Sequence, residues 1–513
     1  MRNLPENISN WSVKLLVTGL ISLLFLNSSA QSPEIRIEKC FGGNGSDIPF
    51  TMKPSGNSEY IVLGTTDSEN GDVHGQHGKN DLWLIKLNAG FDTLWTRCFG
   101  GSETEWAGEI LQTTDGGYLI AGNTHSADGD VQANNGQADA WIIRCNAEGD
   151  ILWTRNYGGS MDEDIYSVIE IPGSGYIAAG VTNSDDGDVH GHYGNFDMWL
   201  IRIDDSGDTL WTRCYGGTGW DAAETIVALE EGTFVVAGSS NSADGDVHGN
   251  HGGTDFFVMK INETGDTLWT RCYGGSESDG IYGFAKTSDD GFIATGYTLS
   301  DDGQVSGNNG DYDAWTIKID GDGELIWSEC FGGSGSDYTG GAMELSNNNY
   351  LFWGYAESPD GDVHGNHGER DCWLMELDRD GDTLWTRCYG GSLNDEIQDL
   401  VETDSGYVFT GFSTSSDGDV LSERHEKTDL WMVELSRLQE PVNPDAIGIE
   451  DHITLFNSFA DIKKYFIFDI SGRLIHCSNG NDIDLDPYSD GIYFVRILTE
   501  TGRIITLKLM KNY

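Results

Sequence analysis

The sequence predicts an all-β protein in which a seven-bladed β-propeller is followed by a small antiparallel, β-sandwich-like C-terminal domain. The first Gly of a Phe/Tyr-Gly-Gly turn lies at residues 42, 100, 158, 216, 274, 332 and 390, so a unit of 58 residues occurs seven times. Each unit contains four short runs of β-branched and aromatic residues, separated by Gly, Asp and Asn. Seven units of four strands match the architecture of a seven-bladed propeller.

The second unit shows the expected elements in order. Residues 109–114 and 118–124 predict a hairpin around an Asp-Gly-Gly turn, and a long polar loop, 125–138, leads to a third strand at 139–146. Residues 150–159 predict the outer strand and the turn into the next unit. This order places the Gly-Gly turns and the long Asp-Gly-Asp loops on one face of the ring, and the hairpin turns on the other.

The ends of the repeat predict how the ring closes. The seventh unit has no outer strand after residues 429–436, whereas residues 35–43 resemble an outer strand and have no unit before them. We therefore expect the N-terminal strand to pair beside 429–436 and complete the last blade. An open solenoid would instead need capping repeats at both ends.

The segment DTLWTRCYGG, found at 208–217, 266–275 and 382–391, is the most faithful part of the repeat. Alternation along a strand places Trp211, Arg213 and Tyr215 on one face of a blade and Cys214 on the other. We expect the Trp to pack between blades rather than to serve as a stacking platform. Six cysteines share the Cys214 column and are predicted to be buried thiols, while a bridge between Cys372 and Cys388 stays open.

The net charge indicates which partners the chain can bind, and the N-terminal sequence indicates whether it is exported. Asp plus Glu number 84 against 29 Lys plus Arg, a formal charge of −55, which disfavours binding to nucleic acid or anionic lipid. Residues 1–30 combine a Lys, an apolar run and small residues before Gln31, the pattern of a cleaved signal peptide. No further apolar run downstream is long enough to predict a transmembrane span.

Carboxylates recur at two positions of every unit. One column lies five residues past the first Gly of the turn, where the chain enters the innermost strand, so we expect it to ring the mouth of the central channel as a set of ligand-binding candidates. Its members are Asp47, Glu105, Glu163, Asp221, Asp279, Asp337 and Asp395. Trp106 and Trp220 interrupt the repeat beside this column and are further candidates, either to stack on a sugar or to fill space.

The second column is the Asp of an Asp-x-Trp/Phe triplet, which follows the Asp-Gly-Asp loop. Carboxylates spaced along one loop suit calcium, and the candidate ligands are Asp128, Asp130, Asp139, Asp186, Asp188, Asp197, Asp244, Asp246 and Asp255. The alternative is that these carboxylates accept backbone N–H groups in turns. Paired His residues in four of the loops are too few to hold zinc, and their placement is typical of a polar surface loop.

The tail differs from the repeat. The sequence predicts a propeller over 31–437, a linker over 438–450 and a C-terminal domain over 451–513. Its motifs FDISGR (468–473), SDGIYFVRI (489–497) and KLMKN (508–512) resemble the C-terminal sorting domain of type IX secretion substrates of Bacteroidota, although the Pro-Asn-Pro motif usual earlier in that domain is missing. The resemblance implies recognition by the type IX secretion machinery, and release or anchoring at the cell surface.

Two functions from different classes fit these observations. The first is an exported binding or structural module with a glycan or protein ligand. The second is an extracellular polysaccharide-active hydrolase or lyase with its site at the channel mouth. Catalysis needs differentiated acid and base residues, whereas the acidic column is present in every unit. The sequence therefore favours the binding module.

Overall fold

The computed structural model describes residues 32–425 and 427–437 and the C-terminal strands. The chain forms two compact units, Met1–Arg437 and Leu438–Tyr513. The expected signal peptide and linker lie outside the described residues. In the part of the chain that the structure describes, no helix is long and apolar enough to cross a membrane.

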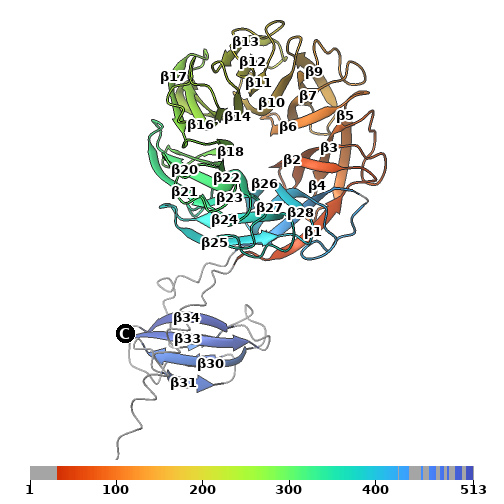
Figure 1. The fold of residues 1–513 in the computed structure, drawn as a ribbon. Helices are drawn as coiled ribbons and strands as arrows, with labels where there is room; N and C mark the ends of the chain where they lie inside the picture. The colour runs from red at the N-terminus through yellow and green to blue at the C-terminus, as the bar shows by residue number, and fades with distance from the viewer. Residues whose placement is uncertain are drawn as a thin grey trace, which may run out of the picture. The chain divides into compact units, whose positions relative to one another are not determined.

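The first unit is a ring of seven four-stranded antiparallel sheets (Figure 1). The innermost strands are β2 (Asp47–Pro54), β6 (Glu105–Gln112), β10 (Glu163–Glu170), β14 (Asp221–Ala228), β18 (Asp279–Lys286), β22 (Asp337–Glu344) and β26 (Asp395–Thr403). The second strands are β3 (Tyr60–Thr66), β7 (Tyr118–Thr124), β11 (Tyr176–Thr182), β15 (Phe234–Ser240), β19 (Phe292–Thr298), β23 (Tyr350–Ala356) and β27 (Gly406–Ser413).

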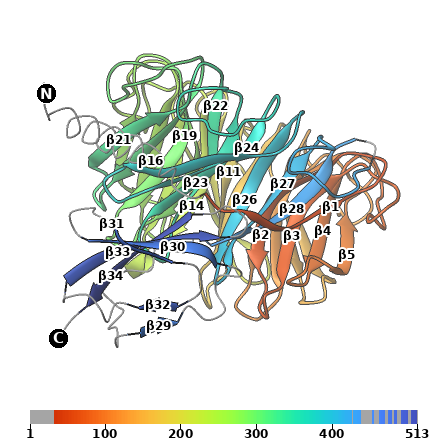
Figure 2. The ribbon, with the colours of Figure 1, turned by 90° about the horizontal axis from the view of Figure 1, so that it is seen from below.

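The outer half of each blade follows in the same order, and Figure 2 shows β2, β3, β4 and β5 side by side in one blade. The third strands are β4 (Asp81–Leu87), β8 (Asp139–Cys145), β12 (Asp197–Ile203), β16 (Asp255–Ile261), β20 (Asp313–Ile319), β24 (Asp371–Leu377) and β28 (Asp429–Ser436). The outermost are β5 (Thr93–Phe99), β9 (Ile151–Tyr157), β13 (Thr209–Tyr215), β17 (Thr267–Tyr273), β21 (Leu325–Phe331), β25 (Thr383–Tyr389) and β1 (Ile35–Phe41). One short 3-10 helix, η1 (Glu230–Gly232), occupies the hairpin turn after β14.

Ring closure is confirmed. The N-terminal strand β1 pairs antiparallel with β28, with Cys40 opposite Trp431 and Phe41 opposite Leu430. An ion pair between Arg36 and Glu434, 2.8 Å long, joins the two strands near their other end. The last blade is therefore built from both ends of the repeat.

Adjacent blades pack through apolar side chains of alternating strand positions. Trp199 of β12 is fully buried against Ile142 and Tyr157 of the preceding blade, in a cluster that also receives the half-buried Trp153 of β9. Each fully buried large side chain contributes roughly 1.5–3 kcal/mol. The expectation that Trp of the repeated segment packs between blades is confirmed, although the Trp of the third strand is the more deeply buried.

Cys372 and Cys388 are free thiols. Cys388 lies opposite Trp373 and Cys372 opposite Tyr389, so the two cysteines are not cross-strand partners and the bridge left open by the sequence does not form. Burial raises the pKa of the Cys272 thiol to about 12, which keeps it protonated and unreactive.

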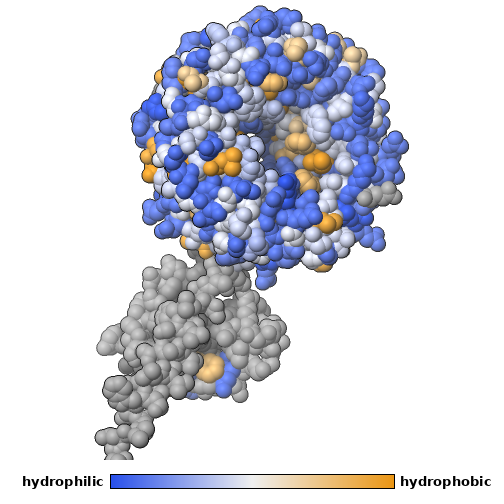
Figure 3. All heavy atoms as spheres, in the orientation of Figure 1, coloured by the Kyte–Doolittle hydropathy of each residue, from blue (hydrophilic) through white to orange (hydrophobic). Residues whose placement is uncertain are grey.

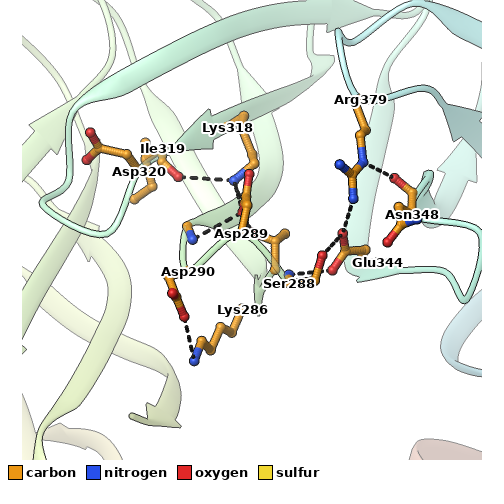
Figure 4. A network of polar contacts seen from close by, with 12 residues as sticks. Lys286, Ser288, Asp289, Asp290, Lys318, Ile319, Asp320, Glu344, Asn348 and Arg379 are labelled. Carbon is orange, nitrogen blue, oxygen red and sulfur yellow. Dashed lines mark hydrogen bonds and ion pairs between the residues drawn. The ribbon is translucent and has the colours of Figure 1, made fainter. Parts of the chain in front are cut away.

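The hairpin-turn face carries hydrogen bonds between neighbouring blades (Figure 4). Ser288 donates its backbone N–H and its hydroxyl to the Glu344 carboxylate of the next blade, at 2.5 and 2.8 Å. Arg379 lies 3.7 Å from the same carboxylate and donates to the Asn348 carbonyl. The same link recurs between Thr114 and Glu170 and between Ser346 and Glu402.

The second unit is antiparallel β, as expected. One sheet has the order β31 (Leu474–Ser478), β30 (Ile462–Asp469), β33 (Gly491–Thr499), β34 (Ile504–Lys511). A second pair consists of β29 (His452–Thr454) and β32 (Asp482–Asp484).

Candidate functional site: the central channel

Every innermost strand contains a β-bulge at the same place. In β10, Ile165 lies opposite Gly180 and Ser167 opposite Ala179, so Tyr166 is an extra residue without a partner on β11. A bulge re-aims the side chain that it carries. The bulged residues of the seven strands are Phe50, Gly108, Tyr166, Glu224, Tyr282, Gly340 and Gln398.

These bulge positions differ from blade to blade, although most of the repeat is nearly invariant. The residue just after the acidic column also differs in every blade, as Ile48, Trp106, Asp164, Ala222, Gly280, Tyr338 and Glu396. All seven bulge residues line one cavity of about 900 Å³ at the centre of the ring. Trp106 and Asp164 line the same cavity. Figure 3 shows this hollow, with apolar residues on its wall. The residues that pack between blades repeat around the ring, whereas the residues that line the channel differ from blade to blade. The channel is therefore the place where this chain is specialised.

Aromatic rings and carboxylates lie together on this wall. Trp106, Tyr166 and Tyr282 line the cavity and are 41%, 37% and 48% exposed. Burial raises the pKa of Asp164 to about 6 and that of Glu224 to about 7. The wall thus offers flat apolar surfaces beside carboxyl groups that titrate near neutral pH.

Part of the channel wall is already neutralised. Lys53 of β2 lies 3.0 Å from Glu109 of β6 and 3.6 Å from Asp399 of β26. Ser167 donates to Glu109, and the backbone N–H of Met52 donates to Asp399. This network ties four neighbouring blades together and holds the one lysine of the cavity lining in ion pairs.

Tyrosines gather beside the channel where the fifth and sixth blades meet. The Tyr297 ring lies 5.6 Å from the ring of Tyr282, 5.3 Å from that of Tyr312 and 5.5 Å from that of Tyr338. Gly280 makes room for this cluster, because a Cβ there would lie 2.4 Å from the Tyr297 ring. This cluster was not expected from the sequence, where its signal is the departure of these positions from the repeat.

The first acidic column is not at the channel mouth, and that expectation is wrong. Each of its carboxylates is buried with no exposed surface and serves the junction between blades. Asp47 accepts hydrogen bonds from the Gly43 N–H at 2.9 Å and from the hydroxyls of Thr66 and Ser68. The same burial holds for Asp47, Glu105, Glu163, Asp221, Asp279, Asp337 and Asp395. Strand entry brings the chain toward the axis, but the side chain points back into the turn.

The Asp-Gly-Asp loops lie on the same face as the Gly-Gly turns, as expected, and hydrogen-bond to them. Asp128 accepts from Ser102 N–H at 2.7 Å, Asp130 from Gly100 N–H at 3.3 Å, and Asp139 from Asn135 N–H at 2.9 Å.

The other calcium candidates have the same kind of partners. Asp186, Asp188, Asp197, Asp244, Asp246 and Asp255 each accept a backbone N–H. Among the described residues no group of three or more His, Cys, Asp or Glu side chains is placed to hold a metal ion. These hydrogen bonds fit the turn-capping alternative, and calcium binding by these carboxylates stays a prediction.

The Asp that begins each third strand keeps one oxygen without a hydrogen bond. At Gly332, a Cβ would lie 2.5 Å from Asp313 Oδ1 and 2.9 Å from Asp337 Oδ2, so the two carboxylates face each other across this glycine. Burial, with the Asp337 charge, raises the pKa of Asp313 to about 6. The unpartnered Oδ1 recurs in Asp81, Asp139, Asp197, Asp255, Asp313, Asp371 and Asp429, within the described part of the chain.

Of the two tryptophan candidates, only Trp106 lines the cavity. Trp220 lies just before β14, where it forms an isolated bridge with Phe196, and its backbone N–H donates to the Asn241 side-chain oxygen. The structure therefore separates two residues that the sequence placed together.

Comparison with known proteins identifies the tail. Residues 445–512 match the family model of a secretion system C-terminal sorting domain. The second unit is a type IX sorting domain. A chain that carries this sorting domain is secreted or displayed at the cell surface.

The propeller itself is similar to proteins of several kinds. Regulatory protein FlaEY of Caulobacter vibrioides is 28% identical over 373 residues, which cover 69% of this chain and 35% of that protein. This chain thus spans about a third of the length of that relative.

Among solved structures, the Pan2 WD40 domain of Neurospora crassa has a TM-score of 0.42 at 10% identity, covering 78% of this chain and 96% of that one. The β-propeller domain of the Trilobed protease from Pyrococcus furiosus has a TM-score of 0.39 at 10% identity, covering 80% of this chain and 100% of that one.

Proposed function

We propose that this chain is an exported binding module whose ligand is held in the central channel. The observation that carries the proposal is the exposure of Trp106, Tyr166 and Tyr282 in the cavity, beside the carboxylates of Asp164 and Glu224. Exposed aromatic rings in a concave site give a ligand apolar contact area, and a few polar groups orient it. A glycan, or a side chain of a partner protein, has surfaces of both kinds.

Replacing Trp106 with Ala tests the site. The side chain is 41% exposed and lines the cavity, so its loss should weaken ligand binding tenfold or more while the melting temperature changes little. Ligands are first found with the mature propeller on a glycan array and in a small-molecule thermal-shift screen, and affinities are then measured by calorimetry. Trp220→Ala is the matched control, because Trp220 does not line the cavity. Equal loss in both variants would place the ligand elsewhere.

An extracellular enzyme is the second candidate, and one observation favours it. Glycoside hydrolysis uses two carboxyl groups of which one is protonated at working pH, and burial raises the pKa of Asp164 to about 6 and of Glu224 to about 7. Incubation of the propeller with the polysaccharides that it binds separates the two functions. Release of reducing ends or of unsaturated products would support the enzyme, and binding without product would support the module.

A further inference from the structure

The channel contains one stretch where aromatic and acidic side chains alternate around the ring. Tyr166, Glu224 and Tyr282 occupy the bulge position of three consecutive innermost strands, β10, β14 and β18. Glu224 lies between Tyr166 and Tyr282 in the order of the innermost strands around the ring, and all three side chains line the cavity. Both tyrosine side chains are exposed there.

Among the described residues, Glu224 and Asp164 have no Lys or Arg partner. Two other carboxylates of the lining, those of Glu109 and Asp399, are both paired with Lys53. Within the described residues, Glu224 and Asp164 form no ion pair and accept no hydrogen bond, and the basic group that lowers the pKa of Asp164 is His125. A partly buried carboxylate without a partner carries a desolvation cost that a bound cation removes.

The surroundings also favour a cation. Tyrosine and tryptophan faces attract cations through the negative charge of the ring face, and the exposed side chains of Trp106, Tyr166 and Tyr282 line the cavity. The chain carries a formal charge of −55, and a concave site focuses a field of one sign. Anionic ligands would be repelled, and neutral sugars could donate hydrogen bonds to the two carboxylates but would not neutralise their charge.

We propose that the channel binds a small organic ammonium ion, whose charge is neutralised by Glu224 and Asp164 and whose alkyl groups lie on the rings of Tyr166, Tyr282 and Trp106. The cavity of about 900 Å³ accommodates an ion with several carbon atoms. This inference rests on the proposed function, a ligand site in the channel, and assigns the class of ligand that the site takes.

The test compares choline with its neutral isostere 3,3-dimethylbutan-1-ol, titrated by calorimetry into the full mature chain. Choline should bind at least tenfold more tightly. Between pH 6 and pH 8 its affinity should rise by about tenfold, because the ionised fraction of a group with a pKa of about 7 rises by that factor. Glu224→Gln should reduce choline affinity at least tenfold and leave only a dependence of about twofold between pH 6 and pH 8, from Asp164 with its pKa of about 6.

Glu396→Gln is the matched control. Glu396 has on β26 the same position as Asp164 on β10, but Arg370 lies 2.9 Å from its carboxylate and neutralises it. Its loss should leave choline affinity within twofold. Thermal melts of both variants verify that the ring is intact.

Each other outcome overturns the inference. Equal binding of choline and its isostere would show that charge is not recognised. An unchanged affinity in Glu224→Gln would show that Glu224 does not bind the ammonium group. Glycan binding without choline binding would sink the ammonium site while leaving the channel as a binding site. If Trp106→Ala has no effect on any ligand found, the proposed function fails as well.

Discussion

At the residue scale, the aspartate that begins each third strand couples stability to pH. Asp313 Oδ2 accepts the Asn309 N–H, while Oδ1 faces the Asp337 carboxylate without a donor. Its pKa is raised to about 6 in the folded state, above the usual value of about 3.9 for an unfolded chain. The proton is therefore bound more tightly in the folded state. The stability that this gives is complete below about pH 4 and is lost as pH rises through about 6.

Asp313→Asn should remove this dependence. The amide keeps an acceptor for the Asn309 N–H and carries no charge toward Asp337. We expect the free energy of unfolding at pH 8 to increase by roughly 1–3 kcal/mol relative to the native chain, and by about a third as much at pH 4.5. Urea unfolding at the two pH values measures the difference. Asp322→Asn, at an exposed turn position, is the control, and an equal effect at both pH values would contradict the prediction.

At the element scale, the links on the hairpin-turn face should be worth more than exposed ion pairs on the same face. Glu344→Ala removes the acceptor of two hydrogen bonds from Ser288, and should lower the free energy of unfolding by about 1–2 kcal/mol. Lys286→Ala removes an exposed ion pair with Asp290 and should cost less than about 0.5 kcal/mol. Denaturant unfolding of both variants measures the two losses in the free energy of unfolding. Equal losses would show that the links between blades are worth no more than exposed ion pairs.

Strand β1 gives a second prediction at this scale. A chain that lacks residues 32–41 leaves β28 as an open sheet edge and exposes the surface that Cys40 and Phe41 cover. We expect a loss of at least about 3 kcal/mol from the two buried side chains. A synthetic peptide of residues 32–41, added in excess, should raise the melting temperature of the shortened chain. A shortened chain that melts like the native one would disprove the role of β1 in closure.

The elements were predictable from the sequence, and the channel was not. The 58-residue period, the strand order and the role of residues 35–43 follow from a pattern that repeats with the packing. Tyr166 is directed into the channel by a bulge, which an alternating strand pattern does not reveal. For Asp47 the sequence predicted a carboxylate at the channel mouth. In the structure its carboxylate is buried and accepts hydrogen bonds from the Thr66 and Ser68 hydroxyls. The usable signal was the variation between units at positions that would otherwise repeat.

At the scale of the whole molecule, charge should govern stability without a bound metal. The Asp-Gly-Asp carboxylates accept backbone N–H groups, so chelation with EDTA should leave the melting temperature unchanged. The formal charge of −55 produces self-repulsion, so NaCl should raise the melting temperature between 0.01 and 0.3 M by screening. Differential scanning calorimetry at matched ionic strength separates the two effects. A drop with EDTA that calcium alone restores would establish a metal site.

The pairing of β1 with β28 determines when the ring can close during synthesis of the chain. The two strands are separated by nearly the whole length of the propeller, so β1 is synthesised first and cannot find its partner until residues 429–436 emerge. The sorting domain, residues 445–512, follows a short distance later in the sequence. Synthesis of the last propeller strand and of the sorting domain thus come in the same short interval. A chain cut short before residue 429 would lack both the partner of β1 and the sorting domain.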